Sequence, residues 1–493
     1  MSRLSVFVKK GWLSGIIFVL LACQERPHHD PLDIHVLAEA YETYKEEGFS
    51  QRRFGHDILQ PLIEKRAADF TVEELGRSVL NAPIHSLETG EGKTKVMLWS
   101  QMHGNESTAT MALFDLFNFF EGPDEDGFED IRATVLENLR IKFIPMVNPD
   151  GAETFQRRNA LDIDLNRDAV SLVSPEAQIL KAARDTFDPA FGFNLHDQNI
   201  YYNTKGSPNP ATISVLAPAY NEATEINEVR LNAMKVIAGM DRLLQQEIPG
   251  HVGKYDDAFE PRAFGDNFQK WGTSTILIES GGYPGDPEKQ YIRKLNFMAI
   301  LNALYEIATE GHQKYTEQAY FSIPDNDSKM MDMIIRNAKV NKNGYTYTAD
   351  IGIRRRETNH GDRDYRISGV IEDLGDLSVF YGYEEITGDD LEIVMGKSYG
   401  ETLNWDEISD GKSLELLQQG HLAIKIKGAA KGKIHGYPIR VFTEDKALPS
   451  EIGLGGPADF FLSEKGKLRY AIVNGYLVDL QNPSDKIYKH LIE

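Results

Sequence analysis

The sequence predicts an α/β protein with a mixed, mostly parallel sheet flanked by helices, followed by a smaller, mainly β C-terminal domain. Between about residues 34 and 311, short apolar runs alternate with amphipathic stretches, as expected for strands and the helices that cover them. After residue 331, strand-like runs separated by glycine-rich turns dominate. The 493 residues allow two or three domains, and the content of 41% apolar and 26% charged residues is that of a globular protein.

The first part is predicted to contain strands buried on both faces, because crossover helices cover both sides of a parallel sheet. Each predicted strand is a short run rich in β-branched, aromatic or other apolar residues. The strands are expected at 95–100, 139–147, 191–195 and 273–278. The covering helices are expected at 107–120, 176–186, 231–246 and 288–309.

The second part is predicted to be a β domain of residues 331–493. Its strands are expected at 333–340, 345–353, 377–383, 423–427, 437–442, 460–462 and 469–480. The polar stretch Ser322–Ser328 indicates a linker, which we place at 314–330. The first domain is then expected to span 34–313.

The N-terminus has the layout of an export signal. Basic residues near the start precede an apolar core at 12–21, and Leu20-Leu21-Ala22-Cys23 closes it, as in a bacterial lipoprotein lipobox. Residues 1–22 are thus predicted to be a lipoprotein signal peptide, with Cys23 lipidated and 23–33 acting as a tether. A plain signal peptide or a membrane helix is the alternative, but a spanning helix needs about 20 apolar residues. This pattern predicts the bacterial cell envelope, with an outer-membrane or periplasm-facing location favoured and the lipid as the sole membrane contact.

Charge and cysteine content exclude several function classes. The chain has 53 basic and 75 acidic residues, a net charge of −22. Nucleic acid is not expected as a partner, because neutralising phosphates requires a basic surface. The single cysteine excludes an intramolecular disulfide and a multi-cysteine zinc site.

Polar clusters lie at the carboxyl ends of the predicted strands, where open α/β sheets bind ligands. Two histidines with one glutamate form the ligand set of a hydrolytic zinc site, another carboxylate can act as a base, and arginines can polarise a carbonyl or hold a carboxylate. Each motif alone is weak evidence, so the argument depends on their order. In chain order they are His103-Gly104-Asn105-Glu106, Asn148-Pro149-Asp150-Gly151, Arg157-Arg158-Asn159, Asp164-Leu165-Asn166-Arg167, His196 and Glu279-Ser280-Gly281-Gly282.

In this order the motifs resemble those of the zinc metallocarboxypeptidase family of carboxypeptidase A type, over about residues 40–310. The resemblance implies one Zn²⁺ per chain, bound by His103, Glu106 and His196. It implies that Glu279 is the general base and that Arg157 polarises the scissile carbonyl. Asn166 and Arg167 would hold the terminal carboxylate of the substrate. Tyr255 lies 24 residues before Glu279 and would match a substrate-binding tyrosine, although the local sequence fits poorly.

The resemblance implies a zinc-dependent metallocarboxypeptidase whose partner is a peptide, or a muropeptide, with a free C-terminus. Asn105 keeps a second hypothesis open, because the form His-Gly-Asn-Glu also occurs in deacylases of N-acyl amino acids. An amidase acting on peptidoglycan stem peptides with the same zinc site is part of that hypothesis. A third is a non-catalytic peptide-binding module, against which Glu279 argues because binding needs no base. Asp266 would either favour a basic substrate residue or accept hydrogen bonds from loop amides.

Overall fold

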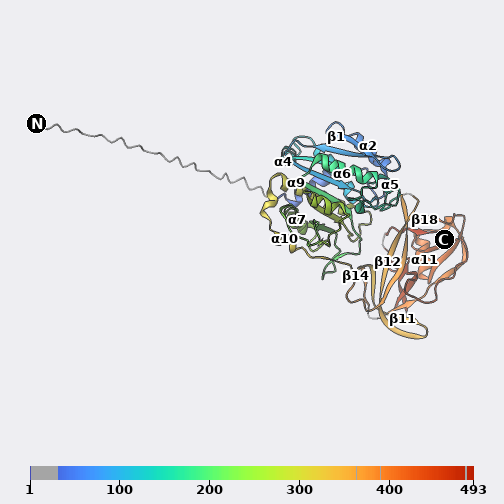
Figure 1. The fold of residues 1–493 in the computed structure, drawn as a ribbon. Coiled ribbons are helices and arrows are strands. Elements are labelled where there is room, and N and C mark those ends of the chain that lie inside the picture. The colour runs from blue at the N-terminus through green and yellow to red at the C-terminus, as the bar shows by residue number, and fades with distance from the viewer. Residues whose placement is uncertain (2–30, 362, 389, 484–485) are drawn as a thin grey trace.

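The computed structural model describes Met1 and residues 31–361, 363–388, 390–483 and 486–493 (Figure 1). The predicted signal peptide and Cys23 lie outside the described residues. Among the residues that are described, no helix combines the length and apolar character needed to cross a membrane.

The predicted fold class is confirmed: within the described residues, an eight-stranded mixed sheet forms the centre of the first region, in the order β1-β2-β4-β3-β5-β9-β7-β8. The inner pairs β4-β3, β3-β5 and β5-β9 are parallel, as is β7-β8, and the other neighbours are antiparallel. The strands are β1 (Thr71–Arg77), β2 (Pro83–Thr89), β3 (Thr94–Ser100), β4 (Leu139–Ile144), β5 (Phe191–Asp197), β7 (Ile213–Leu216), β8 (Val252–Lys254) and β9 (Ser274–Ser280).

Helices cover both faces of this sheet because successive side chains of a strand point to opposite sides. Val96 and Leu98 of β3 belong to the larger core, which they share with α1, α3, α7 and α9. Met97 and Trp99 pack with α6 and α8 on the opposite face. The helices are α1 (Ile34–Tyr44), α2 (His56–Glu64), α3 (Thr108–Phe120), α4 (Glu129–Asn138), α5 (Pro149–Glu153), α6 (Pro175–Phe187), α7 (Glu228–Glu247), α8 (Phe264–Lys270) and α9 (Gln290–Ala308).

The C-terminal region is mainly β, as predicted, with a sheet in the order β13-β12-β11-β15-β20-β21-β22, to which β14 adds by pairing with β11. A small parallel sheet, β16-β17-β19, packs beside α11 (Asp410–Gln418), and β18 pairs with β23. The strands are β11 (Met330–Lys342), β12 (Tyr345–His360), β13 (Asp364–Gly375), β14 (Tyr381–Ile386), β15 (Leu391–Val394), β16 (Lys397–Asn404), β17 (His421–Lys427), β18 (Ile434–His435), β19 (Arg440–Phe442), β20 (Phe460–Glu464), β21 (Lys467–Val473), β22 (Tyr476–Asp479) and β23 (His490–Leu491).

The interval 314–330, predicted to be a linker, is packed against the first region. It contains α10 (Glu317–Phe321) and β10 (Asn326–Asp327), and β10 pairs with β6 (Asn203–Thr204). Tyr320 and Ile323 are buried in the larger core, and the Tyr320 hydroxyl accepts a hydrogen bond from the amide of Ala217. The polar composition of 322–328 concealed this packing, because only a few apolar residues anchor the segment.

Several predicted strands have different limits in the structure. The strand predicted at 469–480 is two strands, β21 and β22, because Asn474 and Gly475 both adopt positive φ and form a tight turn. The strand predicted at 377–383 begins at Tyr381 instead. The strands β5 and β9 extend two residues beyond the predicted ends, so that His196 and Glu279 lie within strands.

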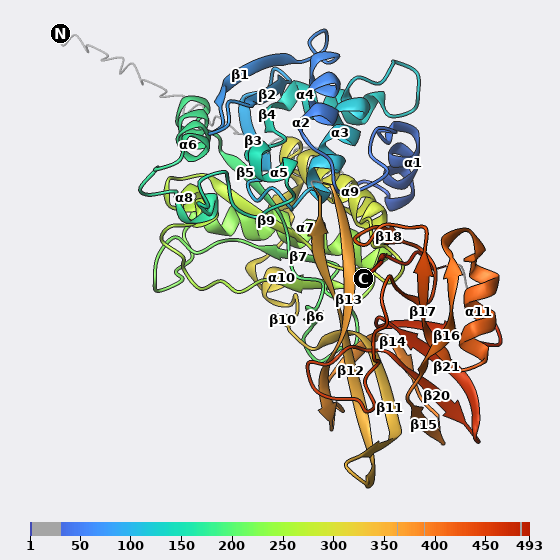
Figure 2. The same cartoon turned by 90° about the vertical axis from the view of Figure 1, so that its right-hand side faces the viewer.

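The C-terminal region contacts the first region through its longest hairpin. Strands β12 and β13 pair from Asp350 to His360 and extend from the β region alongside the first region (Figure 2). Near the hairpin tip, Arg363 pairs with Asp57 and Glu153 of the first region. The two regions therefore share a polar, directly bonded contact.

Candidate active site

A turn between β3 and α3 presents His103 and Glu106. The His103 carbonyl accepts a hydrogen bond from the Glu106 amide at 3.1 Å, which closes the turn and points both side chains the same way. Gly104 is required here, because a Cβ at this position would lie 2.0 Å from the backbone of Gly151. The absence of a side chain thus lets the ligand turn contact the Asn148–Gly151 turn.

Two neighbouring parallel strands present His196 and Glu279. The register of β5 and β9 places these two residues directly side by side, and both are less than a tenth exposed. Because β3, β5 and β9 end at the same edge of the sheet, the histidine, the glutamate and the His103 turn all lie at that edge.

Potential ligand atoms of His103, Glu106 and His196 lie within 4.8 Å of one another, and among the described residues these three form a cluster that could hold a metal ion. The Nδ1 atom of His103 lies 2.8 Å from Glu106 Oε1, and that of His196 lies 2.7 Å from Glu106 Oε2. The two Nδ1 atoms are 3.2 Å apart. Two imidazole nitrogens and one carboxylate oxygen that face a common point are the donor set that zinc prefers.

The electrostatics of the cluster fit a cation. Burial disfavours charge on all three ligands, yet the two histidines hold the pKa of Glu106 well below its usual value. Burial lowers the pKa of His196, and its Nε2 atom is buried without a partner among the described residues. Burial also disfavours the charged form of His103, but Glu106 and Asp164 outweigh this effect and raise the pKa of His103. A buried carboxylate between two histidines therefore favours positive charge at this point.

Arg157 covers the cluster from the solvent side. Its Nη1 atom lies 3.1 Å from His103 Nδ1 and 3.2 Å from Glu106 Oε1, and its side chain is 43% exposed. The ligands beneath it are buried. A guanidinium that is nearly half exposed beside these atoms can contact a molecule that approaches them from solvent.

Two supporting residues were not assigned roles from the sequence. Asp164 accepts from His103 Nε2 at 3.0 Å and from Arg157 Nε at 3.0 Å, and these contacts hold its pKa well below the usual range although burial acts against this. Asn148 donates from Nδ2 to the carbonyls of Met102 and Arg157, at 3.3 and 3.4 Å. The signal was present, since both residues stand in the motifs Asp-Leu-Asn-Arg and Asn-Pro-Asp-Gly, but their partners are distant in sequence.

Asp164→Asn is expected to weaken zinc binding by about 10- to 100-fold, the usual cost of losing a carboxylate that orients a histidine ligand. The contact with Asp164 keeps the proton of His103 on Nε2, so that the unprotonated Nδ1 atom can bind the metal. Competition with a chromophoric chelator measures the zinc affinity, and Asp162→Asn, at an exposed residue of the same loop, serves as control. Equal zinc affinity in both variants would contradict this role of Asp164.

The backbone amide of Asn166 donates to Asp164, but no hydrogen bond joins the side chain of Asn166 or Arg167 to His103, Glu106 or His196. The side chain of Asn166 accepts from the Phe264 amide at 2.9 Å. Arg167 donates from Nη1 to the Asn166 carbonyl at 2.6 Å, and its Nε atom lies 3.2 Å from Glu260. Glu260 therefore occupies one edge of the guanidinium that the resemblance assigns to the substrate carboxylate.

Asp266 accepts a hydrogen bond from the backbone amide of Glu260 at 3.0 Å, and burial raises its pKa to about 6. Of the two predictions for this residue, this contact favours a role in holding the loop.

The charge of Glu279 acts on Tyr255. Tyr255 follows β8, and burial together with the charge of Glu279 raises its pKa well above the usual value. Burial, followed by the charges of Glu106 and Asp197, raises the pKa of Glu279 well above its usual value, while Arg157 and Lys289 act in the opposite direction. In the structure, Glu279 lies beside His196 across the β5–β9 pair, and Arg157 contacts Glu106.

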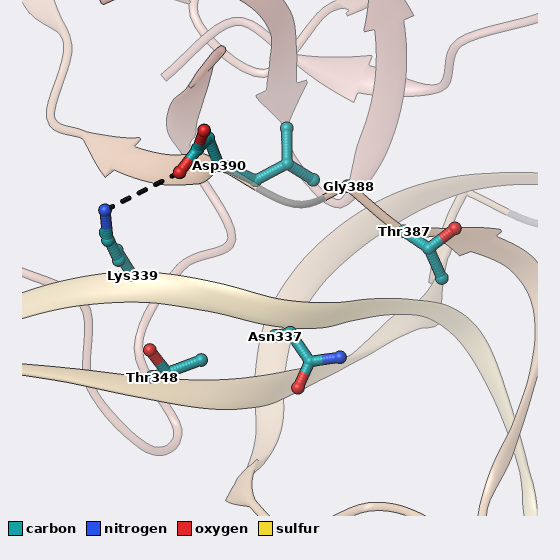
Figure 3. Close-up of a pocket in the computed structure, with 7 residues that line it drawn as sticks. Asn337, Lys339, Thr348, Thr387, Gly388 and Asp390 are labelled. Carbon is teal, nitrogen blue, oxygen red and sulfur yellow. Dashed lines mark ion pairs between the residues drawn. The ribbon is translucent and has the colours of Figure 1, made fainter. Parts of the chain in front are cut away.

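A separate hollow of about 280 Å³ lies in the C-terminal region (Figure 3). It is lined by Asn337, Lys339, Thr348 and Asp390, among others, and a Lys339–Asp390 ion pair lies across it. None of the described residues that line the hollow is a histidine or a glutamate, and the hollow lies outside the ligand cluster.

The fold and the cluster together define a class: an α/β domain that gathers two histidines and a glutamate at the carboxyl edge of its sheet. Residues 57–212 match the family model described as zinc carboxypeptidase. The matched segment contains all three ligands as well as Arg157, whereas Glu279 lies beyond its end.

Two curated relatives are similar to about a quarter of this chain. The "Probable carboxypeptidase 2" of Arthroderma benhamiae is 32% identical over 135 residues, which cover 26% of this chain and 24% of that protein. "Carboxypeptidase SOL1" of Arabidopsis thaliana is 28% identical over 120 residues, covering 22% and 24%. The chain thus spans about a quarter of the length of these relatives. The metallo-carboxypeptidase of Burkholderia cenocepacia superposes on 53% of this chain and 71% of its own, at 17% identity and a TM-score of 0.43.

Proposed function

We propose that this protein is a zinc-dependent metallocarboxypeptidase that releases the C-terminal residue of a peptide. The observation that carries the proposal is the convergence of His103, Glu106 and His196 at one point. Arg157 contacts Glu106 there, and Glu279 lies beside His196 on the neighbouring strand β9. One zinc ion would be held by the three ligands and would supply a Lewis acid that activates water and polarises the peptide carbonyl.

Glu279 and Arg157 have separate roles in the proposed reaction. Glu279 accepts a proton from the attacking water and passes it to the nitrogen of the leaving amine. Arg157 donates to the carbonyl oxygen as negative charge develops there, an electrostatic contribution that is commonly large.

Substrate orientation would come from Asn166 and Arg167, which grip the free terminal carboxylate so that only the last peptide bond reaches the reactive centre. In this proposal the substrate carboxylate competes with Glu260 for Arg167. The N-terminal pattern further suggests that lipid on Cys23 anchors the protein in a bacterial envelope, where peptides and muropeptides are available substrates.

Release of free amino acids from two matched peptides tests the proposal. One peptide carries a free C-terminal carboxylate, and the other is identical but amidated. We expect the free peptide to be cleaved at least about 100-fold faster, because an arginine site built for a carboxylate rejects an analogue that lacks it. Equal rates would overturn the carboxypeptidase assignment. Hydrolysis of N-acyl amino acids alone would make the protein a deacylase instead.

A further inference from the structure

The loop that carries Arg157 contacts the C-terminal region directly. The side-chain amide of Asn359, near the end of β12, donates from Nδ2 to the carbonyl of Thr154 at 3.0 Å and to that of Phe155 at 3.2 Å. Phe155 is two residues before Arg157. A residue about 200 positions further along the chain is therefore bonded to the backbone next to a proposed catalytic group.

The backbone at Phe155 needs such support. Its φ is +50°, in the left-handed region that is unfavourable for a residue with a bulky side chain. Residues in this region persist only where their surroundings hold them. Two sets of hydrogen bonds fix the backbone around Phe155. The amide of Gln156 donates to the Gly151 carbonyl at 2.8 Å within the loop, and the side chain of Asn359 donates to the loop from the C-terminal region.

Arg53 fixes the orientation of the Asn359 amide. Its Nη1 atom donates to Asn359 Oδ1 at 3.0 Å, so the amide nitrogen must face the Thr154 and Phe155 carbonyls. The Arg53 guanidinium lies 4.0 Å from the centre of the Phe155 ring and 4.7 Å from that of Tyr365, and its side chain is 3% exposed. Arg53 also forms an ion pair with Glu357, which lies on β12 like Asn359. The contact is therefore stacked and directionally hydrogen bonded, with buried Arg53 and Phe155 beside the half-buried Asn359.

The supported segment leads directly into the site. Arg157 has its own carbonyl bonded to Asn148 and its side chain bonded to Glu106 and Asp164. These contacts place the guanidinium only if the preceding residues enter the loop at the right angle. A displacement of about 1 Å in a group that stabilises a transition state can lower the rate about 100-fold.

We infer that Asn359 of the C-terminal region is a positioning residue for Arg157, so that the β region forms part of the active site. This inference rests on the proposed function for its kinetic consequence. It does not require Asn359 to contact substrate, and the C-terminal region needs no activity of its own.

The test compares Asn359→Asp with the wild type as a full-length folded protein. The aspartate has nearly the same shape and still accepts from Arg53, but it cannot donate to the two carbonyls. We expect kcat for peptide hydrolysis to fall about 10- to 100-fold, with KM within about threefold and an unchanged zinc content. Asn359→Ala, which removes the donors without adding charge, should show the same change. Arg356→Gln is the matched control, because Arg356 lies on the same strand, is exposed and pairs with Glu372 within the β region.

A second readout does not depend on activity. Hydrogen exchange of the amides from Phe155 to Arg157 should become at least about fivefold faster in both Asn359 variants, with the segment 103–106 unchanged. Unchanged exchange and unchanged kcat would overturn the inference, as would a loss of kcat accompanied by loss of zinc and a lowered melting temperature in both variants. A wild type that releases no amino acid from any peptide would contradict the proposed function, while faster exchange in the variants would still support the positioning role.

Discussion

Glu279→Gln is expected to lower kcat for peptide hydrolysis by about 10³-fold, within the range that a positioned general base contributes. The glutamine keeps the size of the side chain and can still accept a hydrogen bond, but it cannot take up the proton of the attacking water. Glu279 touches none of the three ligand side chains through a hydrogen bond in the structure, so one zinc per chain should remain bound. Stopped assays of released amino acid give kcat, and elemental analysis of the same sample gives zinc content.

Glu317→Gln, at an exposed position in the first turn of α10, is the control for the loss of one carboxylate and should leave kcat unchanged. Wild-type activity in Glu279→Gln would remove this residue from the chemistry. Loss of zinc together with activity would show that its effect acts through the metal site instead.

Lys289→Met is expected to destabilise the first region by about 3–5 kcal/mol at neutral pH, the cost of breaking a buried ion pair by removing one partner. The Lys289 ammonium lies 2.9 Å from Asp197 Oδ2 and 2.9 Å from the Ser280 carbonyl, and its side chain is 8% exposed. Without it, the carboxylate of Asp197 remains buried near the charges of Glu106 and Glu279. Urea unfolding followed by tryptophan fluorescence measures the loss.

The same pair also connects elements that form the site. Asp197 follows the ligand His196, its amide donates to Glu106 at 3.2 Å, and its carboxylate accepts from Thr108 at 2.7 Å. Lys289 itself has a φ of +54°, an unfavourable backbone conformation for lysine that brings its side chain back to the two strand ends. Zinc affinity should therefore fall together with stability.

The double variant Lys289→Met with Asp197→Asn is the decisive control, because it removes both charges and leaves no unpaired carboxylate. It should regain most of the lost stability. A double variant no more stable than Lys289→Met would show that the ammonium does not act by compensating Asp197.

The order of the motifs predicted the ligand cluster because the ligands lie close to strands that the local sequence reveals. Each ligand follows or ends a strand that can be recognised from its apolar run, and parallel strands end at one edge of a sheet. His103, Glu106 and His196 could therefore be expected to meet from sequence position alone, and the structure brings them together. The continuous apolar run from Val96 to Trp99 likewise indicated a buried strand, and the structure buries it on both faces.

The support of the site could not be predicted in the same way. Asp164 and Asn148 stand in recognised motifs, yet nothing local shows that one bonds to His103 and the other bridges Met102 and Arg157. The contact of Glu260 with Arg167 joins residues 93 positions apart. Such polar partners have no periodicity, so sequence patterns do not reveal them.

The sequence by itself determined the fold class, the change to β structure after residue 331, and the residues that supply the proposed chemistry. Only the tertiary structure decided that 314–330 packs into the core and that Asn359 reaches the loop of Arg157. The physical reason is the range of the interactions. Apolar periodicity and turn residues act over a few positions and are visible in the chain, whereas a hydrogen bond between distant segments depends on where packing brings their backbones together.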